Sequence, residues 1–115
     1  MSLPNAEHAI VDDRKIIEYL LSPQHSRGAA KAEFFRRFGF SLAQWTVCRE
    51  ALFAHAQNHE VSAWKRTPFG EAFEVNGRLT SPDGRNPWVR VVWFVRTGET
   101  TPRLATAIPS KGPGP

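Results

Sequence analysis

The residues best suited to chemistry in this sequence are His25 and Lys31, a histidine and a lysine in neighbouring local settings. His25 stands in a short polar segment, Gln24 to Gly28, and Lys31 falls in the first turns of the predicted helix that follows. A cation near a helix N-terminus opposes the helix dipole, so Lys31 is better explained if an anion binds at the same place. For His25, the alternative is a loop histidine that only caps this helix.

A loop histidine beside two or three cations would suit cleavage of RNA without a metal ion. In that reaction a base removes the proton of the 2′-hydroxyl, an acid protonates the leaving 5′-oxygen, and cations stabilise the charge on the phosphate oxygens. Further candidates lie in the C-terminal part of the chain, namely Arg90, Trp93, Arg103 and Thr106. For Trp93 and Thr106 the alternatives are a core aromatic and an ordinary β-branched strand residue.

Other residues that could bind a metal or act as a nucleophile are less convincing. His55 and His59 lie at a predicted helix end with a spacing that can present two ligands to one metal. Neither a carboxylate nor a third ligand completes a motif, so we expect a solvated helix end, no metal site and no cofactor. Cys48 is the single cysteine, which excludes an internal disulfide, and its position predicts a small buried hydrophobe.

Length and composition predict one folded domain with a basic surface. The chain has 115 residues, 41% of them hydrophobic, which is enough for a single core. A formal net charge of +4 favours an anionic partner, although solubility alone explains it equally well. The sequence shows no secretion signal and no apolar run of membrane-spanning length, so we expect a cytoplasmic chain with no membrane partner. A fragment of a larger exported protein would look the same.

Helical periodicity predicts three helices in the first half of the chain. Asp12 is an expected N-cap, and the apolar residues that follow it at helical spacing indicate a helix that ends before Ser22. A second helix is predicted from about Ala29 to Phe38, closed by Gly39 in a left-handed conformation. A third helix follows a capping box that begins at Ser41.

Alternating patterns after residue 60 predict about four strands, of which the last two span Trp88 to Pro109. The first of these two is apolar on both faces, so it should be central, and Arg90 on it then needs a carboxylate, an anion or a strand end beside it. Arg103 is opposite in phase to Thr106. The two can therefore share a sheet face only if a β-bulge lies near Ala105 or the arginine curls over the strand edge.

The predicted fold is α+β, with three N-terminal helices packed on one face of an antiparallel sheet of about four strands connected as a meander. Residues 1–109 should form this single domain. Residues 110–115 are expected to be a disordered tail.

Several segments carry a family resemblance: LPNA (Leu3–Ala6), YLLSPQH (Tyr19–His25), KAEFFRRFGF (Lys31–Phe40) and W-x(9)-R-L-x-T-A-x-P (Trp93–Pro109). Together they resemble an uncharacterised bacterial domain family. Its members occur as free-standing proteins and as the last domain of filamentous-haemagglutinin-like and other polymorphic toxins. That position implies a deliverable activity, most often a nuclease. The order of helices and then sheet is also similar to the barnase, EndoU and RelE-like ribonucleases, as an analogy of fold.

Carried over by this resemblance, the family pattern marks His25, Gly28, Lys31, Trp93, Arg103 and Thr106. It implies a general acid or base in His25, phosphate-binding cations in Lys31 and Arg103, and an orienting hydroxyl in Thr106. Substrate-binding positions would be Arg27, Gly28, Arg90 and Trp93. Family members carry a Gly-Gly pair where this chain has Arg27-Gly28, a change that would weaken an anion-binding nest of backbone amides.

These observations lead us to expect a toxin-type, metal-independent ribonuclease with RNA and a cognate immunity protein or antitoxin as partners. The alternative is a non-catalytic binding module, such as an antitoxin, an immunity partner or a protein-interaction domain. A catalytic set must converge on one cleft, whereas in a binding module His25, Lys31 and Arg103 would lie apart with their own partners. A DNA-directed nuclease is disfavoured because no acidic metal-binding cluster is evident.

Overall fold

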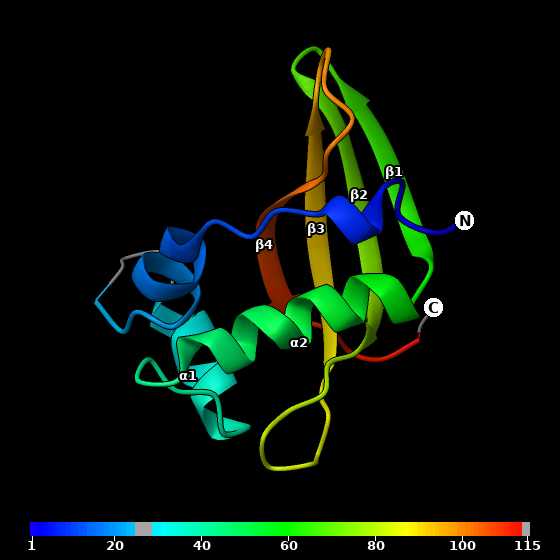
Figure 1. Cartoon of the computed structure of the whole chain (residues 1–115). Coiled ribbons are helices and arrows are strands. Elements are labelled where there is room, and N and C mark those ends of the chain that lie inside the picture. The colour runs from blue at the N-terminus through cyan, green and yellow to red at the C-terminus, as the bar shows by residue number, and fades with distance from the viewer. Residues whose placement is uncertain (25–28, 114–115) are drawn as a thin grey trace.

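The computed structural model describes residues 1–24 and 29–113. Its elements follow in the order η1 (Ala6–His8), η2 (Lys15–Leu20), α1 (Ala29–Arg37), α2 (Trp45–Asn58), β1 (Val61–Thr67), β2 (Gly70–Arg78), β3 (Trp88–Arg96) and β4 (Arg103–Pro109). The strands form one antiparallel sheet in the order β1-β2-β3-β4 (Figure 1). The predicted α+β class and four-stranded meander are confirmed. Within the described residues, no helix is both long and apolar enough to cross a membrane.

The first predicted helix has an unexpected geometry. Asp12 caps it as predicted, because its Oδ1 accepts a hydrogen bond of 2.9 Å from the amide of Arg14. The following element, η2, is a π-helix, in which the amide of Leu21 donates to the carbonyl of Ile16 at 2.9 Å. π-Helical turns are rare in proteins, and many of those that do occur lie at functional sites. The η2 segment is therefore a candidate part of a functional site.

The ends of α1 and α2 follow local sequence signals. Gly39 closes α1 with a φ of 99°, the left-handed conformation that was predicted for it. The next residue, Phe40, packs edge-to-face on Phe35 with ring centroids 6.0 Å apart. The hydroxyl of Ser41 accepts a bond of 3.2 Å from the amide of Gln44, but α2 begins only after this turn.

The helices cover different parts of the sheet. α2 lies across the sheet and contacts β2, whereas η2 and α1 lie beside β4 and contact it and each other (Figure 1). The expectation that three helices pack together on one face is therefore met only in part. Apolar side chains of both groups nevertheless join a single core, in which Ile16, Phe35 and Leu52 are fully buried. The arrangement brings η2 together with α1 and β4, and these last two elements carry the predicted site residues Lys31, Arg103 and Thr106.

β3 is the central strand that its sequence predicted. Val89, Val91 and Trp93 alternate along its buried face and are 0% exposed. Arg90 points to the other face, where its Nε lies 3.5 Å from Oε1 of Glu74 on the neighbouring strand β2. This is the carboxylate that a charged residue on a central strand requires.

A β-bulge interrupts the pairing of β3 with β4. The register pairs Val92 with Thr106, Trp93 with Leu104 and Phe94 with Arg103. Ala105 is therefore an extra residue, opposite no partner of its own. Because Val92 and Phe94 share one face of β3, their partners Thr106 and Arg103 also share a face. The bulge removes the phase conflict that the sequence pattern implied.

Two residues whose side chains could bind a metal or act as a nucleophile, His55 and Cys48, have structural roles instead. His55 was expected on a solvated helix end, but it is 2% exposed, and its Nε2 lies 3.2 Å and 3.1 Å from the carbonyl oxygens of Gly77 and Val89. Burial, and then the nearby His59, lower the pKa of His55 to about 4, so the ring is neutral at neutral pH. Cys48 is buried as predicted, and burial raises the pKa of its thiol to about 12.

The segment after β4, for which disorder was expected, is described as far as Pro113. The amide of Ser110 donates to the carbonyl of Trp88 at 3.0 Å. The side-chain amide of Asn76 donates to the carbonyl of Gly112, also at 3.0 Å. These two bonds attach the segment to β3 and β2.

Candidate functional site

A tyrosine on η2 connects the three elements that meet beside β4. The hydroxyl of Tyr19 lies 3.0 Å from the hydroxyl of Thr106 on β4, and either group can donate the hydrogen bond. Nζ of Lys31 on α1 lies 5.5 Å from the centroid of the Tyr19 ring, and Nζ of Lys15 on η2 lies 5.4 Å from it. We call these four residues, Tyr19, Thr106, Lys15 and Lys31, the Tyr19 cluster.

The packing of η2 positions two members of this cluster. Ile16 and Leu20 lie one turn apart and are fully buried, which anchors the helix in the core. Lys15 and Tyr19 immediately precede these anchors, so they are also one turn apart and both lie at the margin of the core, where they are half-buried. Their side chains therefore remain close to each other and accessible from outside.

The surroundings of Tyr19 lower the pKa of its phenol. Partial burial raises this pKa, but hydrogen bonds with Thr106 and Lys31 and the positive charges of Lys31 and Lys15 outweigh the effect of burial. The net pKa therefore lies below the ordinary value of about 10. A phenol of lowered pKa is a stronger acid than an ordinary tyrosine, which suits proton transfer.

The two lysines of the cluster form no ion pair within 4.0 Å with any carboxylate that the structure describes. The single acid of η2, Glu18, lies 3.9 Å from Arg14, and the single acid of α1, Glu33, lies 3.0 Å from Arg37. Within residues 1–24 and 29–113, no group of three or more His, Cys, Asp or Glu side chains could hold a metal. Uncompensated ammonium groups beside two hydroxyls suit an anion such as a phosphate.

A pH titration measures the environment of Tyr19 directly, because the chain contains a single tyrosine. We expect the ultraviolet absorbance of the phenolate to develop with a midpoint below about 10. In Lys31→Ala the midpoint should rise, because this substitution removes a hydrogen bond and a charge that lower the pKa. Lys65→Ala, which removes an exposed charge on β1, is the matched control and should leave it unchanged. Equal midpoints in folded and urea-unfolded protein would contradict the lowered pKa.

The structure brings two of the predicted catalytic residues together. Lys31 and Thr106 both interact with Tyr19, although they belong to different elements. Three other predicted positions, His25, Arg27 and Gly28, lie outside the described residues, in the connection between η2 and α1.

Arg103 is close to the cluster in register but is oriented by another partner. It shares a strand face with Thr106, and its Nε lies 3.5 Å from Oε1 of Glu99 in the turn before β4. The same Nε is buried and has no hydrogen-bond partner among the described residues, so the contact with Glu99 is electrostatic. The guanidinium thus already has one anionic neighbour.

Arg90 and Trp93, the other two predicted binding residues, have partners or positions of their own. Arg90 pairs with Glu74 on the face of β3 opposite the core. Trp93 is fully buried, and its indole Nε1 has no hydrogen-bond partner in the described part of the chain. A ring in this position cannot stack on a ligand unless the core opens.

Tyr19 was not among the predicted site residues. Two signals in the sequence point to it: it is the only tyrosine of the chain, and it precedes the segment that contains His25. Its role depends, however, on a partner 87 positions away, Thr106, which no local pattern reveals.

Comparison with known proteins agrees with this fold. Residues 2–111 match the family described as a domain of unknown function, DUF6883. A chain in the structure titled "Contact-dependent growth inhibition toxin - immunity protein complex" from Klebsiella pneumoniae 342 is similar to this one, with a TM-score of 0.68, 17% identity, and 89% of this chain and 100% of that chain covered. At this identity the likeness shows a common fold. No curated protein matches the sequence. The chain is therefore a member of the DUF6883 family.

Proposed function

We propose that this protein is a toxin-type ribonuclease that cleaves RNA by attack of the 2′-hydroxyl on the adjacent phosphate, without a metal ion. The observation that carries this proposal is the Tyr19 cluster, an acidified phenol between two lysines that pair with no described carboxylate. The similarity in fold between this protein and a chain of a toxin–immunity protein complex supports a role in a toxin–immunity system.

Each member of the cluster has a role in this reaction. The ammonium groups of Lys15 and Lys31 would bind the non-bridging phosphate oxygens and stabilise the charge that grows on them. The phenol of Tyr19, whose lowered pKa makes it a stronger acid than an ordinary tyrosine, would donate its proton to the leaving 5′-oxygen. The hydroxyl of Thr106, 3.0 Å away, orients the phenol.

The remaining predicted residues complete the proposal. His25 would act as the base that removes the 2′-hydroxyl proton, and the products would be a 2′,3′-cyclic phosphate and a 5′-hydroxyl. Arg103 lies on the same strand face as Thr106, about 7 Å along the strand, and would bind a neighbouring phosphate. Arg27 and Gly28 would contribute a charge and a backbone amide to the same anion site.

A ribonuclease of this kind acts on cytoplasmic RNA and would harm the cell that makes it. We therefore propose a cognate immunity protein or antitoxin as a partner. The similar Klebsiella pneumoniae 342 chain comes from a complex of a toxin and an immunity protein, which is consistent with such a pairing.

Incubation of the purified protein with total RNA, in parallel reactions with and without EDTA, tests the proposed activity. We expect fragments with 2′,3′-cyclic phosphate and 5′-hydroxyl ends from the wild type and intact RNA from His25→Ala. His8→Ala, which removes an exposed histidine, is the matched control and should cleave normally. RNA that stays intact across a broad titration of wild-type protein would overturn the proposal in favour of a binding module. Cleavage abolished by EDTA would indicate a metal-dependent nuclease instead.

A further inference from the structure

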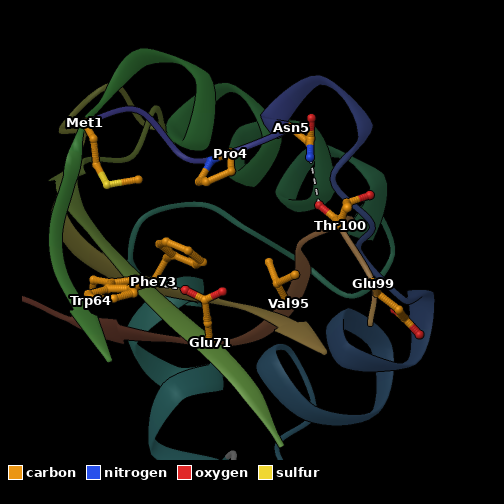
Figure 2. A pocket seen from close by; sticks show the side chains of 9 residues that line it. All are labelled: Met1, Pro4, Asn5, Trp64, Glu71, Phe73, Val95, Glu99 and Thr100. Atoms are coloured by element: carbon orange, nitrogen blue, oxygen red, sulfur yellow. Dashed lines mark hydrogen bonds between the residues drawn. The ribbon is translucent and has the colours of Figure 1, made fainter. Parts of the chain in front are cut away.

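A second site candidate is a pocket of about 420 Å³, whose lining includes no residue of the Tyr19 cluster. Trp64, Phe73 and Val95, from three adjacent strands, lie on one side of it, and the N-terminal segment lies on the other (Figure 2). The side-chain amide of Asn5 donates to the carbonyl of Thr100 at 2.9 Å and closes one end. The volume falls in the range of ligand pockets, which is about 300–1,000 Å³.

Two carboxylates, Glu71 and Glu99, are the charged side chains among the described residues that line this pocket. Glu99 is already paired, because its carboxylate lies 3.5 Å from Arg103 and 4.0 Å from Arg96, and Figure 2 shows it directed away from Phe73. Glu71 forms no ion pair within 4.0 Å with any described residue. Its carboxylate is directed into the space beside Phe73 (Figure 2). An apolar pocket with an unpaired carboxylate is complementary to a cation that has an apolar body.

The wall next to Glu71 is the aromatic ring of Trp64. The indole Nε1 of Trp64 donates to Oε2 of Glu71 at 2.8 Å, while the side chain as a whole remains 51% exposed. The guanidinium carbon of Arg66 lies 5.5 Å from the centroid of the same ring, which shows that this indole already accepts a guanidinium as a neighbour. Arg66 lies opposite Glu71 in the register of β1 and β2, and it lines an adjacent hollow that shares Glu71 and Val95 with this pocket.

We propose that this pocket binds an arginine side chain presented by a protein partner. The guanidinium would pair with the Glu71 carboxylate and stack on Trp64, and the alkyl stem would pack against Phe73 and Val95. We favour a protein over a free small molecule because two residues that line the pocket, Trp64 and Met1, are 51% and 64% exposed. Exposed aromatic residues beside a pocket, and arginine as the inserted anchor, are typical of interface hot spots.

NMR titration with blocked amino acids tests this proposal without knowledge of the partner. The probe is N-acetyl-arginine amide, and the matched control is N-acetyl-citrulline amide, which has nearly the same shape but no charge. We expect the arginine probe to shift the indole N–H signal of Trp64, assigned with Trp64→Phe, and the citrulline probe to bind about tenfold more weakly. Equal affinities of the two probes, or no shift at saturating arginine probe, would overturn the proposal.

Substitutions locate the binding site, and a comparison with free arginine distinguishes an arginine of a protein partner from a small-molecule ligand. Glu71→Gln keeps an acceptor for the indole of Trp64 but removes the charge, so it should weaken the arginine probe about tenfold, whereas Glu74→Gln on the opposite sheet face should not. If Glu71→Gln disturbs the fold, the comparison of the two probes on wild-type protein still decides. Free arginine that binds more tightly than the blocked probe would assign the pocket to a small molecule and overturn the protein partner.

Discussion

Replacing Lys31 by alanine should lower kcat/KM for RNA cleavage by a factor of about 10²–10³, the usual loss when one electrostatic donor of a transition state is removed. Lys31 has two connections to the reaction, since its ammonium would bind the phosphate and it also lowers the pKa of Tyr19. The substitution therefore weakens charge stabilisation and proton transfer together. Cleavage of a defined oligonucleotide under single-turnover conditions measures the effect.

The matched control for this prediction is Lys65→Ala, which removes one exposed positive charge from β1. If general attraction of RNA to a basic surface were responsible, both variants would lose affinity to a similar extent. A loss in the chemical step confined to Lys31→Ala supports the Tyr19 cluster. A single-turnover rate that Lys31→Ala leaves unchanged would remove the cluster from the mechanism.

Replacing Trp93 by alanine should lower the free energy of unfolding by about 3–5 kcal/mol, the range for a large aromatic lost from a core. Trp93 is 0% exposed on the central strand and is paired with Phe73 on β2 and Leu104 on β4. Since domains of this size are stable by about 5–15 kcal/mol, the variant should lose a large part of its stability. Urea unfolding followed by circular dichroism measures the difference.

One further variant tests whether Trp93 also contacts a substrate, as the family resemblance implies. Trp93→Phe keeps an aromatic ring in the core, and its kcat/KM, corrected for the folded fraction, should equal that of the wild type. Reduced cleavage in a variant of unchanged stability would restore a substrate role for this position. Trp64→Ala, which removes an exposed indole, should cost about 1 kcal/mol or less and serves as the stability control.

Most elements of this fold could be predicted because their causes lie within a few residues of the chain. Gly39 adopts a φ of 99° where helical periodicity stops, a conformation that glycine adopts at little cost. The turn from Thr67 to Gly70 is stabilised by its own side chain, since Oγ1 of Thr67 accepts from the amide of Phe69 at 3.1 Å. Strand alternation likewise identified β3 as central before any partner was known.

Other features depend on contacts between distant parts of the chain. His55 occupies a helix end that the sequence marks as polar, and it is buried because that end packs against the carbonyl groups of β2 and β3. The bulge at Ala105 exists only in the register between β3 and β4, which period-two patterns do not specify. Neither residue type nor spacing distinguishes these cases beforehand.

The sequence by itself determined the α+β class, the four-strand meander and the candidacy of Lys31 and Thr106, because periodicity and residue chemistry are local properties. Only the tertiary structure decided that Tyr19 links these two residues, that Trp93 belongs to the core, and that Glu71 faces an apolar pocket without an ion-pair partner among the described residues. Each of these depends on which segments meet in space. Contacts between these segments determine which side chains are buried and which charges are paired. Those two properties decide which residues of suitable type form a candidate site.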